Sequence, residues 1–548
     1  MPFDIQHRVS ELSITSTVVI LTMIFIFCTW LRHQFGQNKL RPLPPGPRKL
    51  PLLGNSLDMP STHQWLKFSE WADQFNTDIL HLKVAGGDYI VLSSYEASTE
   101  LLDRRSGIYS NRPHITMLQD LVGWDGDVVL LPYGKSLHAH RKLFHQEFHP
   151  ANSMIHRPHE KKARTIFLNN LIETPEEWLE HIKQMIGTII LAVAYGIRVQ
   201  SKDDANIVAA EKMTTIFKAA GMPGSFLVDI FPILRYIPSW FPGASFKRKA
   251  KSWRGIFQKT ITPPFMHVKQ AMINGTAEDS FTLRCLQNVK NPDPQANHLS
   301  EEEEIIKETA GAMYEAGADT GVTALRTFLL AMMSFPNVQK EAQEELDNVV
   351  GKERLPDYED LDTGLLPFAY AVILECFRWQ PVVPLGFPHK LDKEDTYKGY
   401  FFPKGSIVAS NVWRILRDEK IYGVDTDTFN PKRWLQLRTE KSNDGEQGRS
   451  KWILNSNMMK NDPMSISFGF GRRVCPGKHM GLSTFHSTVA SLLHCFDIAP
   501  PLGEDGIPMV PKIEYISGVL NSPAPFKCSI NPRSKEHVAI VQQALMLI

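Results

Sequence analysis

The first pattern along the chain is an apolar run, residues 12–31, that contains no charged residue. A helix needs about 20 apolar residues to cross the hydrocarbon core of a bilayer, so we expect a single transmembrane anchor here. The alternative is a cleaved signal peptide, but the run is long for one. No small-x-small cleavage site follows it before Arg32, and the anchor is therefore our interpretation.

Basic residues and prolines follow this run. Six basic residues lie between positions 32 and 49, whereas only His7 and Arg8 precede the run, a bias that predicts a cytosolic location for the rest of the chain. Five prolines between positions 42 and 51 favour an extended spacer over an ordinary proline-rich loop. We divide the chain into a luminal terminus (1–11), an anchor (12–31), a basic proline-rich linker (32–55) and one domain (56–548).

Helical signals dominate the body of the chain. Ser300 followed by Glu303 forms a capping box, and no proline interrupts residues 301–334 before Pro336. The pattern predicts a helix of about 34 residues, roughly 50 Å long, which can cross a whole domain. A second helix is expected over residues 368–380, closed by Pro381.

Strand signals are weaker and more local. Extended segments with turns follow the second helix, through Gly399-Tyr400 and Pro403-Lys404-Gly405. The polar residues 438–462 indicate a surface loop, and the chain beyond Pro532 gives no clear signal. The expected fold is therefore mainly α with a small β domain.

Composition narrows the class of protein. Hydrophobic residues make up 43% and charged residues 22% of the chain, which is typical of a compact globular protein. Lys plus Arg number 60 and Asp plus Glu 59, so nothing indicates a nucleic-acid partner. The six cysteines are scattered without a C-x-x-C pair, which argues against a disulfide framework or a zinc site and suits a reducing compartment.

One cysteine has an unusual setting. Cys475 lies between a glycine-rich turn and an expected helix start, in FGFGRRVCPGKHMG. Glycines at 469, 471 and 477 permit tight backbone geometry and the close approach of a large flat ligand, and Pro476 suits a first helical position. The dipole of the following helix favours the thiolate form of the cysteine.

This segment resembles the heme-binding loop of the cytochrome P-450 superfamily, F-x-x-G-x-R-x-C-x-G, at Phe468, Gly471, Arg473, Cys475 and Gly477. The resemblance implies heme b as the cofactor and the helical-prism fold of that family, preceded here by the anchor. It implies that Cys475 is the axial iron ligand and that Arg473 pairs with a heme propionate. A thiolate ligand donates electron density to iron and favours O–O cleavage.

Two further segments resemble elements of that family. Glu375 and Arg378 lie three residues apart on the second expected helix and can pair there. They resemble the family's E-x-x-R element, and the later FNPKRW segment supplies Arg433 as the implied third member of a structural triad. Taken alone, Glu375 and Arg378 would be an ordinary ion pair.

The long helix carries Ala316-Gly317-Ala318-Asp319-Thr320. Small residues such as Ala316 leave room for a flat cofactor, and Asp319 with Thr320 can relay protons. The simpler alternative is a threonine hydroxyl bonded to a preceding carbonyl of its own helix. The run resembles the family's oxygen-activation motif, which favours monooxygenation over rearrangement of a peroxide.

Residues 131–148 resemble the family's third helix, with one departure. The usual W-x-x-x-R element has Leu137 in place of tryptophan and keeps Arg141. The resemblance implies that Arg141, and His389 on a later strand, contact heme propionates. Leu137 removes one such contact.

The resemblance also implies partners. No nucleotide-binding glycine motif is apparent, so electrons are expected from NADPH through a separate cytochrome P-450 reductase, with cytochrome b5 as an optional second donor. Lys142, Arg472 and Lys478 are candidates for its docking surface. The anchor places the protein in the endoplasmic reticulum membrane, single-pass, facing the cytosol, where the sequon at Asn274 stays unused.

The candidate pocket walls are residues 115–131, 313–316 and 382–387, which are mainly apolar and favour a hydrophobic small molecule. The chain looks most like fungal microsomal members, which oxidise terpenoids and other secondary metabolites; xenobiotic oxidation is a related use. Two other classes stay open, a thiolate-heme isomerase or dehydratase and a heme-based binding or sensor protein.

Overall fold

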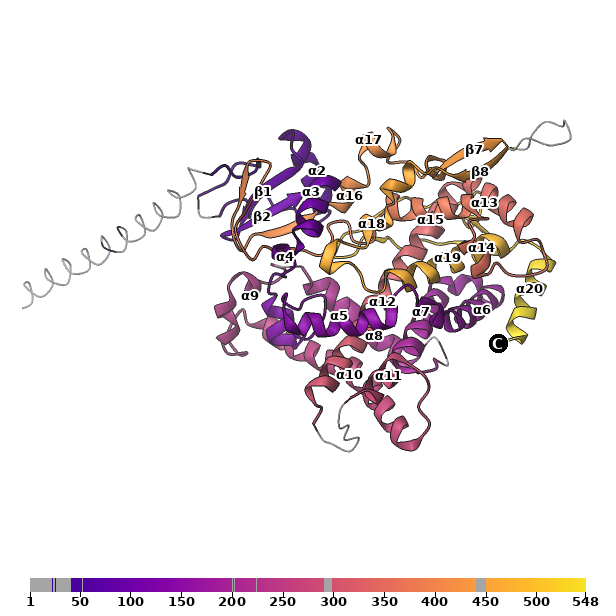
Figure 1. The fold of residues 1–548 in the computed structure, drawn as a ribbon, viewed down its shortest axis with the longest axis horizontal. Helices are drawn as coiled ribbons and strands as arrows, with labels where there is room; N and C mark the ends of the chain where they lie inside the picture. The colour runs from indigo at the N-terminus through magenta and orange to yellow at the C-terminus, as the bar shows by residue number, and fades with distance from the viewer. Residues whose placement is uncertain are drawn as a thin grey trace, which may run out of the picture.

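Helices form most of the molecule, and short sheets gather at its edges (Figure 1). The structure is a computed structural model. It describes residues 22, 25 and 41–548, apart from positions 52, 200, 202, 223, 290–297 and 440–449. In these residues the mainly helical fold with small sheets is confirmed.

The long helix predicted over residues 301–334 is α12 (Glu301–Ser334). Ser300 and Glu303 form the expected capping box, and Pro336 begins the next helix, α13 (Pro336–Val349). Helix α12 runs through the middle of the molecule, packed against α7 (Trp178–Tyr195), α5 (Lys135–Phe148) and the cysteine-side helix α19 (Lys478–Cys495) (Figure 1). It therefore connects the cysteine side of the domain with the opposite helical layer.

The second predicted helix is α15 (Pro367–Trp379), which starts with proline at its first position. It is buried against α12, α13 and α19. The remaining helices and 3-10 or π turns are α2 (Gln64–Gln74), α3 (Tyr95–Ser98), η2 (Thr99–Arg104), α4 (Ser106–Tyr109), η3 (Met117–Val122), η4 (Ser153–His156), α6 (Arg157–Glu173), η5 (Pro175–Glu177), α8 (Ala205–Ala220), α9 (Leu227–Ile230), η6 (Pro232–Tyr236), α10 (Ser245–Asn274), α11 (Phe281–Gln287), α14 (Tyr358–Asp362), α16 (Val412–Ile415), α17 (Glu419–Tyr422), η7 (Pro431–Trp434), η8 (Met458–Asn461), α18 (Met464–Ser467), η9 (Gly471–Arg473) and α20 (Lys535–Met546).

The largest sheet has the strand order β1-β2-β6-β3. Its strands are β1 (Ile79–Val84), β2 (Gly87–Leu92), β6 (Ile407–Ser410) and β3 (His389–Lys390). Strands β1 and β2 are antiparallel, with Ile79 opposite Leu92, whereas β2 and β6 are parallel. Strand β3 pairs with β6 so that His389 lies opposite Val408, and this pairing fixes His389 inside the domain.

Four two-stranded sheets complete the described part of the fold. They are β4 (Asp395–Tyr397) with β5 (Tyr400–Phe402), β7 (Leu435–Thr439) with β8 (Ser450–Leu454), β9 (Phe496–Ala499) with β12 (Ser529–Pro532), and β10 (Tyr515–Ile516) with β11 (Ser522–Pro523).

The prediction of a loop over residues 438–462 was wrong at both of its ends. Strand β8 and η8 lie inside this range, and β7 and β8 form an antiparallel pair with Leu435 opposite Leu454. The pairing supplies backbone partners that the polar sequence does not reveal. Likewise, the uninformative chain end forms α20, capped by Ser534.

The predicted anchor lies outside the described residues except at Thr22 and Phe25. Among the helices that the structure describes, none has the length and apolar character needed to cross a bilayer.

Candidate active site

Cys475 lies in a tight loop between η9 and α19. Its backbone amide donates to the Phe468 carbonyl at 2.8 Å, which closes the loop. Gly471 adopts a φ of +52°, and a Cβ there would lie 2.5 Å from the Leu102 carbonyl, so only glycine lets the loop lie so close to η2. The glycine-rich turn is thus required by the packing of the loop itself.

The Cys475 side chain reaches open space, although protein atoms surround the sulfur on most sides. This burial raises the pKa of the thiol, while the Gly477 amide, Arg141 and Lys478 act in the opposite direction without outweighing it. A thiol coordinated to a metal cation is deprotonated. The sulfur is therefore suited to a bound cation that compensates its charge.

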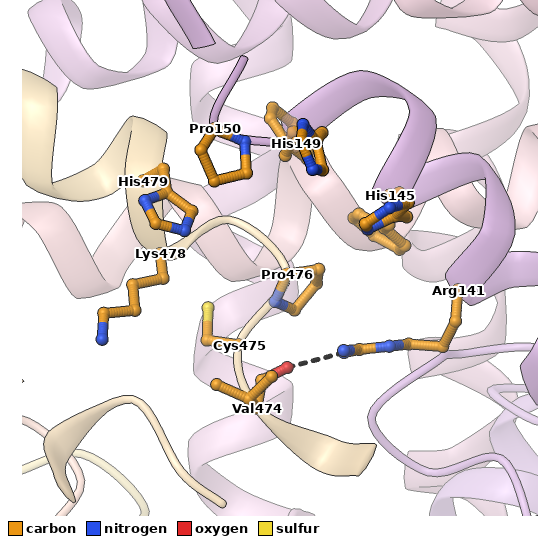
Figure 2. Close-up of a pocket in the computed structure, with 11 residues that line it drawn as sticks. Arg141, His145, His149, Pro150, Val474, Cys475, Pro476, Lys478 and His479 are labelled. Carbon is orange, nitrogen blue, oxygen red and sulfur yellow. Dashed lines mark hydrogen bonds between the residues drawn. The ribbon is translucent and has the colours of Figure 1, made fainter. Parts of the chain in front are cut away.

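Three arginines and one histidine lie around this loop, and we call them the open cluster. Arg141 of α5 donates to the Val474 carbonyl at 2.6 Å, next to Cys475 (Figure 2). Arg473 donates to the carbonyls of Ser110, Val128 and Leu131 at 2.6 to 3.1 Å. The other members of the open cluster are Arg112 and His389.

Arg112 and His389 complete the open cluster from the neighbouring strand region. Arg112 donates to the carbonyls of Phe387 and Pro388 at 2.6 and 2.8 Å. His389 is buried, and its Nδ1 lies 2.7 Å from the Tyr109 carbonyl. Since a carbonyl can only accept, Nδ1 is the protonated ring nitrogen and Nε2 is left as the second polar atom.

The open cluster contains half-buried positive charge that has no acidic neighbour among the described residues. Within the described residues, Arg112, Arg141 and Arg473 have no carboxylate within ion-pair distance, and their hydrogen bonds go to carbonyls. Burial lowers the pKa of Arg473 to about 10 and the pKa of Arg112 well below its ordinary value. Buried charges are normally paired, so this donor set fits a ligand that carries carboxylates.

A hollow of about 280 Å³ opens beside Cys475, between α5 and the start of α19 (Figure 2). Its lining combines cationic and imidazole groups with Phe144, Phe148 and two prolines. The polar lining residues are Arg141, His145, His149, Lys478 and His479. This face of the molecule is therefore positively charged and concave.

Helix α12 borders another open space halfway along its length. Ala316 is exposed there, although Met313 and Val322 on either side are buried. Thr320 donates its hydroxyl to the Ala316 carbonyl at 2.9 Å, which is the simpler of the two roles expected for it. Gly317 faces elsewhere, because a Cβ on it would lie 2.1 Å from Ile190 of α7. Ala316 therefore borders the open space, whereas Gly317 allows α7 to pack closely against α12.

Asp319 is turned away from Thr320. Its carboxylate lies 2.6 Å from the Lys218 ammonium of α8, and it lines a separate pocket of about 40 Å³ between α7, α8 and α12. The side chains of Asp319 and Lys218 are 25% and 39% exposed, although the Asp319 oxygen that faces Lys218 is itself covered. Asp319 thus links α12 to α8 in this structure.

Comparison with known proteins identifies the family. The model of the family described as Cytochrome P450 matches residues 44–530. The chain belongs to the cytochrome P450 family. It is 39% identical over 531 residues to cytochrome P450 monooxygenase 98 of Postia placenta, covering 96% of this chain and 97% of that protein. It is 36% identical over 521 residues to the tryptamine 4-monooxygenase of Psilocybe cyanescens, covering 95% and 98%.

This family membership gives the protein its enzyme class. Cytochrome P450 enzymes use heme b and receive electrons from a redox partner, so the chain is a heme-dependent monooxygenase. The similar proteins that carry functional names are fungal monooxygenases. They favour oxygen insertion over the isomerase and sensor alternatives.

In this P450, the three predicted triad residues meet inside the protein, and we call them the closed triad. Glu375 accepts from Arg378 Nε and Nη2, both at 2.8 Å, and from Arg433 Nε at 3.0 Å. Trp434 and the Asn430 amide also donate to it at 2.9 Å. All of these groups are buried or nearly so. Every lone-pair direction of the Glu375 carboxylate is used.

Other predicted positions have more ordinary surroundings. Phe468 packs against Phe377 of α15, with ring centroids 5.5 Å apart. Gly477 has open space where a Cβ would stand. Leu137 is 1% exposed within the main hydrophobic core, so the position usually held by tryptophan is closed by packing here.

Sequence reasoning missed Arg112. The residue lies in SNRPH, a segment without a recognised motif, and an isolated arginine in a sequence is usually a surface residue. Its neighbours Ser110, Asn111 and His114 are polar as well, so the local pattern gave no signal for a buried role. Its place in the open cluster depends on β3, which brings the 387–389 backbone beside it.

Proposed function

We propose that Cys475 is the axial ligand of the heme iron and that the open cluster holds the heme propionates. The observation that carries this proposal is the set of half-buried cations Arg112, Arg141 and Arg473, which lie around the cysteine without acidic partners among the described residues. The heme, when bound, supplies the oxygen chemistry. The protein residues bind and orient it and compensate its carboxylates.

Proton delivery is the proposed task of Asp319 and Thr320. Thr320 lies one turn from the exposed Ala316 on the same face of α12, so its hydroxyl borders the reaction space. The Asp319 and Lys218 side chains are partly exposed, so solvent can supply protons to Asp319. We propose that Asp319 returns protons to Thr320 when it leaves Lys218, and that Ala316 keeps the cofactor side of the helix open.

The proposed substrate is a hydrophobic small molecule, for example a terpenoid of secondary metabolism. Two of the expected wall segments meet in an aromatic group: Trp124 packs against Phe217 of α8, which packs against Phe387 with centroids 6.1 Å apart. Phe217 was not among the predicted wall residues. Aromatic walls favour apolar ligands, and the tryptamine 4-monooxygenase relative acts, by its name, on an aromatic amine.

The proposed electron donor is an NADPH-cytochrome P450 reductase, with cytochrome b5 as an optional second donor. The concave cationic face beside Cys475 supports this, because it contains Lys478 and lies next to Lys142 and Arg472. Charge reversal at Lys142, Arg472 and Lys478 is expected to lower reductase-supported turnover and spare peroxide-supported turnover. Equal loss of both activities would indicate folding damage and contradict docking at this face.

We also propose attachment to the endoplasmic reticulum membrane by residues 12–31, with the catalytic domain in the cytosol. An exposed apolar segment supports a membrane contact of the domain itself. Leu227, Phe231, Ile233, Tyr236 and Trp240 in and after α9 and η6 are 56% to 77% exposed, and such patches mark interaction surfaces. Full-length protein should float with phospholipid vesicles; sedimentation without them would exclude the attachment.

The decisive experiment is Cys475→Ser in the full chain, with Cys528→Ser as the matched control. We expect Cys475→Ser to lose the red-shifted Soret band of the reduced carbon monoxide complex and all NADPH-dependent oxygen consumption. Cys528→Ser should keep both, since Cys528 directly precedes β12, which pairs with β9 beyond the end of α19 that lies away from Cys475. An unchanged Soret band in Cys475→Ser would refute the assignment.

A further inference from the structure

Three potential metal ligands meet where α13, α19 and α20 end or begin. Asp347 lies in the last turn of α13, His494 in the last turn of α19 and His537 in the first turn of α20. One ligand atom from each lies within 4.8 Å of the others. The imidazole rings of His494 and His537 are 5.3 Å apart at 82° to each other. The cluster is separate from the heme site.

The two histidines are buried, and most of their ring nitrogens lack a close hydrogen-bond partner among the described residues. His494 is 0% and His537 3% exposed. Among the described residues, the Nε2 of His537 and both ring nitrogens of His494 make no hydrogen bond of ordinary length and angle, and the Arg354 backbone carbonyl interacts with the His494 ring more weakly. Buried polar atoms without partners are uncommon in folded proteins and need an explanation. These nitrogens face one another and the Asp347 carboxylate, which is the arrangement of a ligand set.

A second shell orients the cluster. His537 Nδ1 lies 2.9 Å from the Ser534 hydroxyl, which leaves Nε2 as the free ring nitrogen. Arg533 donates to both Asp347 oxygens at 2.7 and 2.8 Å and fixes the plane of the carboxylate. Each carboxylate oxygen has a second lone pair. Partners of this kind commonly hold metal ligands in place.

The geometry points to a zinc site formed by Asp347, His494 and His537, with water as the fourth ligand. Two imidazole nitrogens and one carboxylate oxygen are a donor set that zinc accepts in tetrahedral geometry. The side chain of Asp347 is 30% exposed, so a hydrated ion can enter from its side. The Arg533 charge opposes the cation and limits the affinity, which we expect in the micromolar range.

The site gives the carboxyl-terminal helix a structural role. Helix α20 lies at the edge of the molecule, beside α6 (Figure 1). Zinc would join α20 to the end of α19, whose first residue follows Cys475 by only a short loop. Without zinc, Arg533 still joins these elements through its ion pair with Asp347 and its hydrogen bond to the His494 carbonyl. The sequence argued against a zinc site because that argument used only the spacing of cysteines, and this cluster contains no cysteine.

The test uses full-length holoenzyme that has been treated with a chelator and titrated with zinc by calorimetry. Wild type should bind one equivalent, while His537→Gln and Asp347→Asn should bind at least tenfold more weakly. His267→Gln, an exposed histidine of α10, is the matched control and should bind like wild type. An unchanged Soret spectrum verifies folding of each variant. Equal zinc affinity in all four proteins, or no saturable binding in wild type, would overturn the proposal.

A second measurement needs no substitution. Zinc should slow hydrogen exchange in residues 533–546 of the wild-type holoenzyme and raise its Tm by roughly 2 to 4 °C at saturation, because a ligand that binds only the folded state stabilises it. If zinc slowed hydrogen exchange around other histidines but not in residues 533–546, the result would contradict the site.

Discussion

The closed triad and the open cluster both bury arginines, but they compensate the charge differently. In the closed triad, Glu375 accepts from both Arg378 and Arg433, and the charges are paired within the protein. In the open cluster, Arg112 and Arg473 donate only to backbone carbonyls. In a structural ion network the protein pairs all of the charges, whereas a ligand-binding site leaves positive charge unpaired until the ligand binds.

The largest effect is expected from Glu375→Gln. The substitution leaves two buried guanidinium groups without their common carboxylate, which costs about 3 to 5 kcal/mol when one partner of a buried pair is removed. Heme content and circular dichroism should both fall, because the apoprotein itself is destabilised. Glu341→Gln is the control: Glu341 pairs with Lys432 at a half-exposed site and should change stability by less than about 0.5 kcal/mol. A stable holoprotein with Glu375→Gln would refute the structural role of the closed triad.

A smaller and different effect is expected from Arg473→Met. Removal of this unpaired, half-buried cation should leave the apoprotein as stable as wild type, since desolvation already disfavours the charge and lowers its pKa to about 10. Loss of one charge-assisted bond should speed heme loss by roughly tenfold. Transfer of heme to an acceptor globin measures the rate.

The matched control for this substitution is Arg104→Met, which removes an arginine that is 73% exposed and paired with Glu100. Its heme loss should match wild type. If Arg473→Met unfolds the apoprotein in the same way as Glu375→Gln, the contrast between the two clusters is wrong.

The smallest effect concerns pH. His486 of α19 packs edge-on against Tyr370 of α15, at 5.3 Å, and burial lowers its pKa to about 4. The folded state binds fewer protons than the unfolded state between this value and the ordinary pKa of about 6.5. The stability that depends on neutral His486 is therefore fully present above pH 6.5 and is lost as the pH falls towards 4.

Thermal unfolding between pH 7 and 4.5 measures this loss. His486→Phe should flatten the decline, and the exposed-site variant His267→Gln should retain it. An identical decline in all three proteins would exclude His486 as a source. The closed triad has no histidine, so its own ion pairs should persist over this range.

Much of the fold and site followed from local sequence. Ser300, Glu303 and Pro336 determine the ends of α12, and Pro381 follows α15, because caps and prolines act within one turn of the chain. The residues of the closed triad were found because Glu375 and Arg378 lie on one helical face. The β7–β8 pair and α20 were missed, since pairing and docking partners stabilise them more than their own residues do.

The sequence by itself determined helices α12 and α15, the cysteine loop and the enzyme family, because these depend on neighbouring residues and on motifs that a linear chain carries. Tertiary structure alone decided that Arg112 joins Arg141 and Arg473, that Asp319 turns to Lys218, and that Asp347, His494 and His537 meet. These contacts join segments far apart in the chain. Their existence depends on how whole helices and strands pack, and no local pattern encodes that packing.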